Sequence, residues 1–322
     1  MNYRQLGRTG LGVSEIGLGC SGFWGDRLFA EAKAIAIVRE AFEKGVSLFD
    51  TGHNYSNYNA EPRLGRAIRQ IDRSRLIIST KAGTLRRSSF RLLGYKRHNT
   101  DYSPDYIEAA CGKSIKNLGC DYIDIFQLHG ITAAEFTDEL STRLQSMKQR
   151  GMYCRLGINT HREADMLFVA KHPELFDVVL IDFNVCQLDR LPVIEKLHAA
   201  GIGVLAGTVL AQGHLIKGKI GRWRKPADAW YLARAVLRAE GRRLAKCASG
   251  MQQTLASLPG ITPAQAAIAF VLGQSGITSC IVGTTSITNL RELLDGSDRR
   301  LLPEEQSAIW RTFRAQPDRV SR

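Results

Sequence analysis

Four ionisable side chains stand at or just beyond the ends of apolar runs in the first 130 residues. Asp50 closes VSLFD, Lys81 closes IISTK and His129 closes FQLH, while Tyr55 follows Asp50 within a short polar stretch. A free tyrosine has a pKa of about 10, which is too high for ready proton release near neutrality. A chain that presents these four groups together could transfer a proton.

Charge interactions give each of the four a role. The Lys81 ammonium would lower the pKa of Tyr55 by stabilising the phenolate, and Asp50 would keep Lys81 charged. His129 could hydrogen-bond the oxygen that Tyr55 protonates. Singly, an aspartate can cap a helix, a histidine can belong to the core, and a lysine can reach to water. Together they predict a general acid for carbonyl reduction, a role that contributes roughly 10²- to 10⁴-fold to a rate.

The elements that must position these residues alternate along the whole chain. Short β-branched runs predict strands over 16–19, 46–50, 75–80, 122–128, 153–158, 177–182, 202–206 and 279–282. Helical patterns cover 29–44, 61–70, 103–118, 133–150, 161–171, 189–200, 262–275 and 286–295. Eight such alternations predict an α/β fold, a parallel (β/α)8 TIM barrel, with a doubly wound open sheet as the alternative.

Further features complete the predicted architecture. An opening β-hairpin over roughly 2–13 would close the bottom of the barrel, and long loops would surround the C-terminal mouth. No linker interrupts the chain, so a single domain over 1–322 is expected. Because the C-terminal ends of barrel strands meet at one mouth, the four side chains above should gather there.

Composition excludes several classes of protein. No run of eighteen apolar residues occurs and the N-terminus lacks a signal-peptide layout, so neither a membrane span nor secretion is predicted. The seven cysteines are scattered without a CxxC pair, which favours a reducing, cytoplasmic location over a disulfide or zinc framework. No metal site is expected.

The net charge of +13 lies largely in segments 85–97 and 214–246. A solvated basic surface and an anion-binding loop both fit these segments. Nucleic acid is disfavoured as a partner, because no basic region interleaves with stacking aromatics.

A glycine pattern near the start resembles a dinucleotide fingerprint. The stretch from Gly17 to Gly22 fits GxGxxG. A true fingerprint follows a full strand and opens directly into a helix, whereas here the preceding segment is broken and further loop residues intervene. The glycines therefore fit a first barrel loop better than a Rossmann turn.

The chain resembles the aldo-keto reductase family over nearly its whole length. The motifs are LGRTGLGVSEIGLG, LFDTGHNYSNYNAEPRLGRAI, STKAG, SIKNLGCDYIDIFQLHG, RLGIN and ITPAQAAIAFVL…GITSCIVGTTSITNLREL, in family order. The resemblance implies a barrel without a Rossmann fold that binds NADPH, with NADH as the alternative, across its mouth. It implies the catalytic tetrad Asp50, Tyr55, Lys81 and His129, with hydride passing between the nicotinamide and a carbonyl or alcohol.

The resemblance also implies residues that contact the cofactor: Gly19, Asn159, Thr160, Thr208, Gly283, Thr284, Thr285 and Asn289. Several of these positions depart from the family. Asn159 and Thr160 stand where Ser-Asn is usual, Leu180 replaces a glutamine, and Gly207 replaces an aromatic residue. The usual basic residue for a 2′-phosphate is missing after the last strand. Arg291, or the basic loop with Lys217, Lys219, Arg222 and Arg224, could supply that charge.

Phe23 and Trp24 are the expected walls of the substrate pocket. The predicted partner is a small carbonyl or alcohol compound. The expected oligomeric state is a monomer or a small homo-oligomer. A non-catalytic, nucleotide-binding regulatory barrel is the main alternative, motivated by the altered nicotinamide positions. A specialised enzyme with an unusual redox or elimination step is a weaker one.

Overall fold

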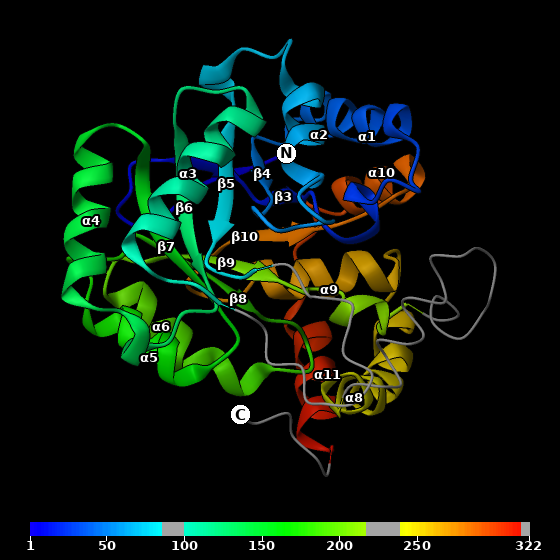
Figure 1. Cartoon of the computed structure of the whole chain (residues 1–322). Coiled ribbons are helices and arrows are strands. Elements are labelled where there is room, and N and C mark those ends of the chain that lie inside the picture. The colour runs from blue at the N-terminus through cyan, green and yellow to red at the C-terminus, as the bar shows by residue number, and fades with distance from the viewer. Residues whose placement is uncertain (86–99, 217–238, 317–322) are drawn as a thin grey trace, which may run out of the picture.

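The computed structural model describes residues 1–85, 100–216 and 239–316 (Figure 1). Eight parallel strands close into a barrel in the order β10-β3-β4-β5-β6-β7-β8-β9. The strands are β3 (Ile16–Gly19), β4 (Leu48–Asp50), β5 (Ile77–Ala82), β6 (Ile123–His129), β7 (Tyr153–Thr160), β8 (Val178–Asp182), β9 (Gly203–Gly207) and β10 (Ile277–Val282). The predicted (β/α)8 barrel is therefore confirmed, and the open sheet is excluded.

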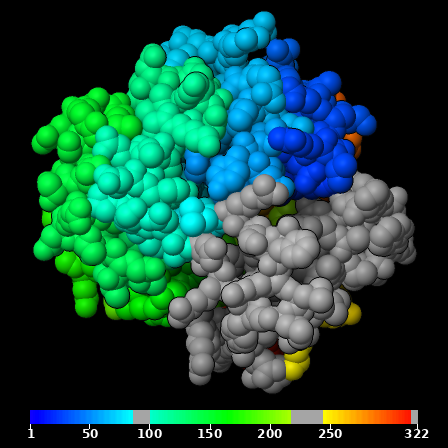
Figure 2. Space-filling model, viewed as in Figure 1, coloured from blue at the N-terminus to red at the C-terminus, as the bar shows by residue number. Residues whose placement is uncertain are grey.

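The described helices surround the barrel (Figure 1). They are α1 (Glu31–Glu43), α2 (Ala60–Ile68), α3 (Pro104–Leu118), α4 (Asp138–Gln149), α5 (Glu163–Lys171), α6 (Leu191–Ala199), α8 (Ala239–Ala256), α9 (Pro263–Leu272), α10 (Ile287–Asp295) and α11 (Pro303–Arg314). α9 begins with a capping box formed by Thr262 and Gln265 and with a proline in its first turn. In the space-filling view, the segments coloured from blue through green occupy the upper and left part of the visible face (Figure 2).

The predicted strand positions hold to within about two residues, and the shift of β5 has a local cause. Asp72 caps a short 3-10 turn over Arg73–Arg75 by accepting a hydrogen bond from the Ser74 amide, which delays the strand to Ile77. At the other end, Lys81 and Ala82 still pair with β6. Lys81 therefore lies within the strand near its carboxyl end, with a backbone fixed by sheet hydrogen bonds.

An N-terminal hairpin closes the barrel bottom, as predicted. β1 (Tyr3–Gln5) pairs with β2 (Gly12–Ser14) in antiparallel register. The hairpin contributes Leu6 and Val13 to an apolar cluster inside the barrel, together with Leu48, Ile77, Ile125, Val178, Leu180 and Leu205. Gly7 has a φ of +52°, and a Cβ there would approach the Gly201 carbonyl oxygen to 2.4 Å, so this close docking requires glycine.

The inward-facing positions follow directly from this cluster. Because side chains alternate along a strand, the residues two positions beyond the apolar ones also face the barrel interior. We call the uppermost of these positions, one per strand, the mouth layer: Gly19, Asp50, Lys81, His129, Asn159, Asp182, Gly207 and Gly283. Every residue of the mouth layer thus lies at the C-terminal end of the barrel.

The cysteines differ from the prediction, which disfavoured disulfides. Cys186, after β8, and Cys247, on α8, form a disulfide across 61 residues of sequence. The fold brings them together, and their spacing gives no signal of it. The remaining five cysteines are free.

Within the described part of the chain, no helix combines the length and apolarity that crossing a bilayer requires. Lys217, Lys219, Arg222, Arg224 and most of the basic segments 85–97 and 214–246 lie outside the described residues.

Candidate active site

A buried ion pair lies at the centre of the mouth layer. The Lys81 ammonium donates to Asp50 Oδ2 at 2.5 Å and to the Thr51 carbonyl oxygen at 2.8 Å. The two side chains are almost completely buried, with exposed fractions of 0% for Lys81 and 6% for Asp50. A charge this deep requires a counter-charge, and each residue supplies it for the other.

Two neighbouring polar side chains, which were not predicted, complete the surroundings of Asp50. Ser79 Oγ donates to Asp50 Oδ1 at 2.8 Å, and Gln127 Nε2 lies 3.4 Å from the same oxygen and 2.6 Å from Ser79 Oγ. Ser79 precedes Lys81 by two positions, and Gln127 precedes His129 by two. The two-residue period of a strand therefore carried a signal that these side chains share the barrel interior.

Tyr55 lies against the ion pair and His129. The Lys81 nitrogen is 5.3 Å from the centroid of the Tyr55 ring, and the rings of Tyr55 and His129 meet edge to face with centroids 5.6 Å apart. The four residues expected to gather at the mouth are thus brought together. A Cβ at Gly52 would lie 3.1 Å from carbons of the Tyr55 ring, so glycine lets this ring pack directly on the backbone.

A left-handed turn holds Tyr55 in position. Ser56, Asn57 and Tyr58 have φ values of 51°, 57° and 64°, in a region that L-residues rarely occupy. The turn is fastened to the loop after β3, because Ser56 Oγ donates to the Gly22 carbonyl at 2.8 Å and Asn59 Nδ2 to the Gly25 carbonyl at 2.7 Å. The glycine-rich first loop therefore supports the turn that carries the phenol.

The electrostatics of Lys81 and Tyr55 differ from the simplest expectation. Burial alone lowers the pKa of Lys81, but Asp50 and Tyr55 more than offset it, so the pKa of Lys81 is raised and the ammonium persists. Burial raises the pKa of Tyr55 above its ordinary value, and the opposing charge of Lys81 does not cancel that effect. Lys81 therefore lowers the pKa of Tyr55 as predicted, but burial outweighs this effect, and the phenol is protonated at neutral pH.

The expected cofactor positions fall into three groups. The first is a set of glycines on adjacent strands: Gly207 on β9, Gly283 just past β10 and Gly19 on β3. A Cβ at Gly207 would lie 3.3 Å from the Ile181 carbonyl oxygen, and one at Gly283 3.4 Å from that of Gly19. We call these three positions of the mouth layer, which carry no side chain, the glycine floor.

The second group comes from β7 and β9. Asn159 faces the barrel interior and donates to the Leu180 carbonyl at 3.1 Å. Thr160 faces outward, where its hydroxyl donates to Asp165 on α5 at 3.0 Å. Thr208 has a φ of 51° and its side chain hydrogen-bonds Asp182. Asn159 and Thr208 therefore border the mouth, whereas the side chain of Thr160 supports the start of α5.

The third group surrounds the start of α10. The Thr284 hydroxyl accepts from the Ser286 amide at 3.1 Å, and Ser286 Oγ accepts from the Asn289 amide at 3.3 Å. Thr285 lies in the same half-buried turn. Arg291, considered as a source of positive charge, is held by Glu40 of α1 at 2.7 and 3.0 Å. The N-terminus of α10 is suited to an anion, but the Arg291 guanidinium is already paired.

The expected pocket walls differ in their placement. Trp24 is buried, and its indole nitrogen donates to the Ala34 carbonyl of α1 at 3.2 Å. This position belongs to the core and does not favour a role as a pocket wall. Phe23 is half-buried with its ring centroid 5.7 Å from that of Phe29, and its role stays a prediction.

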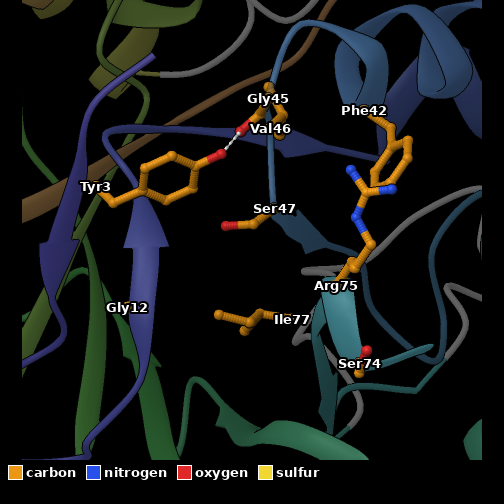
Figure 3. Close-up of a pocket in the computed structure, with 9 residues that line it drawn as sticks. All are labelled: Tyr3, Gly12, Phe42, Gly45, Val46, Ser47, Ser74, Arg75 and Ile77. Atoms are coloured by element: carbon orange, nitrogen blue, oxygen red, sulfur yellow. Dashed lines mark hydrogen bonds between the residues drawn. The ribbon is translucent and has the colours of Figure 1, made fainter. Parts of the chain in front are cut away.

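A separate cavity of about 300 Å³ lies at the opposite end of the barrel (Figure 3). It is lined by residues at the start of β4 and β5, including Ser47 and Ile77, and by Tyr3 of the hairpin. The Tyr3 hydroxyl donates to the Gly45 carbonyl there at 2.8 Å. Since Asp50 and Lys81 stand at the other ends of these strands, the cavity is distinct from the mouth layer.

Comparison with known proteins agrees with this geometry. The model of the aldo/keto reductase family matches residues 15–315. An uncharacterized oxidoreductase of Bacillus subtilis, YqkF, is 29% identical over 317 residues, covering 95% of this chain and 94% of its own. L-galactose dehydrogenase of Arabidopsis thaliana is 28% identical over 325 residues, covering 96% and 94%.

A solved structure shows the same fold. The holo form of the aldo-keto reductase AKR11C1 from Bacillus halodurans superposes with a TM-score of 0.76 at 23% identity, over 97% of this chain and 96% of that one. The family match spans almost the whole barrel, including all four residues around the buried ion pair. The chain belongs to the aldo-keto reductase family of oxidoreductases.

Proposed function

We propose that the protein interconverts a small carbonyl compound and its alcohol, using a nicotinamide cofactor, with Tyr55 as the group that gives or takes the proton. The observation that carries this proposal is the buried Lys81–Asp50 pair, with Tyr55 and His129 packed beside it at the barrel mouth. A buried ammonium next to a phenol and a histidine is costly to maintain as structure alone.

In the carbonyl-reducing direction, a protonated phenol is needed. The raised pKa of Tyr55 keeps its hydroxyl protonated at neutral pH, so the hydroxyl can donate to a carbonyl oxygen. The Lys81 ammonium then stabilises the negative charge that develops on Tyr55, and Asp50 keeps that ammonium charged. His129 orients the substrate oxygen toward the phenol.

The glycine floor supports binding of the cofactor. Gly207, Gly283 and Gly19 would admit a planar ring beside the ion pair, and the N-terminus of α10 would hold a phosphate. When bound, the nicotinamide supplies or accepts the hydride. We propose NADPH as the cofactor. NADH is the alternative, because Glu40 pairs with the nearby Arg291 and weakens the attraction of Arg291 for a 2′-phosphate.

The substrate class is an aldehyde, ketone or sugar. A relative of this length named L-galactose dehydrogenase supports including sugars among the candidates. We place the protein in the cytoplasm, as a monomer or small homo-oligomer with no nucleic-acid or membrane partner. The Cys186–Cys247 disulfide is uncommon for a protein of that compartment.

Titration of the purified protein with NADPH and with NADH, followed by nucleotide fluorescence, tests the proposal. We expect saturable binding of at least one cofactor, and oxidation of the bound cofactor when aldehydes or ketones are added. Saturable binding without turnover on a broad panel of carbonyls and alcohols would favour a regulatory barrel instead. Failure to bind either cofactor would contradict the proposal.

A further inference from the structure

The mouth layer contains a second carboxylate that the proton-transfer residues do not use. Asp182 ends β8, and its side chain is 11% exposed. His161 Nδ1 lies 2.7 Å from Asp182 Oδ2, and the Thr208 side chain also hydrogen-bonds this carboxylate. These contacts fix the carboxylate at the inner rim of the barrel.

Asp182 is ionised. Burial alone would raise its pKa, but the hydrogen bond and charge of His161, the charge of Arg190 and the Thr208 hydrogen bond outweigh burial and lower it. Arg190 donates to the main-chain carbonyls of Asp182 and His161 and not to the carboxylate itself. The negative charge therefore remains directed to the interior, where it acts on Tyr55 across the barrel mouth.

The residue opposite Asp182 in the sheet carries no side chain. In the sheet register Asp182 pairs with Gly207, and a Cβ at Gly207 would lie 3.8 Å from Asp182 Oδ1. The carboxylate thus stands at the edge of the glycine floor that begins on β9. Because Gly207 has no side chain, none would separate the carboxylate from a nicotinamide ring bound on this floor.

The fixed charges of the mouth layer are unbalanced. Two carboxylates, Asp50 and Asp182, accompany one ammonium, Lys81. Since Asp50 neutralises Lys81 at 2.5 Å, Asp182 is the carboxylate that remains among these three groups, and its counter-charge, His161, lies outside the mouth layer. An oxidised nicotinamide ring is cationic and a reduced one is neutral, so a nearby fixed carboxylate discriminates between the two forms.

We infer that Asp182 sets the redox preference of the site, by stabilising the oxidised over the reduced nicotinamide and so making the bound reduced cofactor a stronger hydride donor to a carbonyl. In that direction, a hydride with its two electrons passes from the reduced cofactor to the carbonyl carbon. Tyr55 supplies the proton to the carbonyl oxygen, and the carbonyl becomes an alcohol. This inference rests on the proposed function, because it requires a nicotinamide at the mouth.

The test compares binding of the two cofactor forms and needs no turnover. Dissociation constants for oxidised and reduced cofactor are measured by calorimetry and fluorescence at one pH and salt concentration, for the wild type and Asp182→Asn. The amide keeps the shape of the side chain and removes its charge. We expect the ratio of the oxidised to the reduced dissociation constant to rise about 10-fold in Asp182→Asn, because His161 and Arg190 partly screen the charge.

Asp177→Asn is the matched control, since Asp177 adjoins the opposite end of the same strand and pairs with Lys148. Its ratio should equal that of the wild type. An unchanged ratio in Asp182→Asn, or equal weakening of both forms, would overturn the inference, because a structural role weakens both forms alike.

The wild type alone provides a second measurement, should Asp182→Asn not fold. It should bind the oxidised form at least as tightly as the reduced form, and tighter binding of the reduced form would refute the inference. Failure of the wild type to bind either form would instead remove the proposed function on which the inference rests.

Discussion

At the residue scale, the site depends on two buried groups, Asp50 and Lys81, and on the half-buried Tyr55 beside them. Asp50 keeps Lys81 charged, and Lys81 acts on Tyr55. Ser79 and Gln127 extend this network beneath the mouth layer. Each group therefore has a testable effect on either chemistry or stability.

Tyr55→Phe removes only the hydroxyl. We expect turnover to fall by roughly 10²- to 10⁴-fold, because the proton donor is lost, while the ring still packs on Gly52 and His129. Steady-state kinetics measures the loss, and cofactor titration should give an unchanged dissociation constant. Turnover at the wild-type rate would show that the phenol is not the acid.

Asp50→Asn should destabilise the fold by about 3–5 kcal/mol, because it leaves the Lys81 ammonium buried without a counter-charge. Removing the ammonium as well, in Asp50→Asn/Lys81→Met, should recover part of that loss. Denaturant unfolding measures both free energies.

An exposed pair provides the comparison for this cycle. Asp105→Asn disrupts the contact between Arg143 and Asp105, whose side chain is 90% exposed, and should cost at most about 1 kcal/mol. If the losses from Asp50→Asn and Lys81→Met simply add, the two side chains are not coupled as described.

At the scale of elements, short loops position the groups that the strands alone do not. β4, β5 and β6 end in Asp50, Lys81–Ala82 and His129, but Tyr55 depends on the left-handed turn that follows β4. That turn is anchored to the loop after β3 through Ser56 and Asn59. The two adjacent βα loops therefore act as one unit.

Asn57 tests the importance of this turn, because it is exposed and has a φ of 57°. Asn57→Ala should lower the free energy of unfolding by about 1 kcal/mol, since alanine tolerates the left-handed region less well than asparagine. Asn57→Gly should be close to neutral, since glycine adopts positive φ readily.

Thermal or denaturant unfolding distinguishes the two substitutions at Asn57. We also expect Asn57→Ala to reduce turnover more than Asn57→Gly, because the turn positions Tyr55. Equal stability of the alanine and glycine variants would mean that backbone strain in this turn is unimportant.

At the scale of the whole molecule, several buried groups hold their protons more tightly in the folded than in the unfolded chain. Burial is the main cause of the raised pKa values of Tyr55, Tyr102 and Tyr153. For Lys81, burial lowers the pKa, but Asp50 reverses this effect and the pKa is raised. The pKa of Tyr106 is raised by burial to about 12.

This pattern predicts loss of stability at alkaline pH. Above pH 10 the unfolded tyrosines release protons that the folded protein retains, so the unfolded state binds fewer protons and stability falls as pH rises. Each such group contributes about 1.4 kcal/mol per pH unit until its folded pKa is reached. Urea unfolding from pH 8 to 11 measures this slope.

Tyr153→Phe should give a shallower decline than the wild type above pH 10, because one of these groups is removed. A free energy of unfolding that stays constant from pH 9 to 11 would contradict the assignment. The expected direction is the same for all the groups named above, so their effects accumulate.

The sequence by itself determined the barrel, its hairpin and the gathering of Asp50, Tyr55, Lys81 and His129. Strand periodicity, helix caps and the convergence of parallel strand ends are local or topological rules, and all of them can be read without coordinates.

Only the tertiary structure decided the features that depend on distance and burial across the fold. It buried Tyr55 enough to raise its pKa, turned Trp24 into the core and paired Arg291 with Glu40. It also joined Cys186 to Cys247 and left Asp182 beside a floor of glycines. Desolvation and long-range pairing depend on which distant surfaces come into contact. The spacing of residues along the sequence does not reveal those contacts.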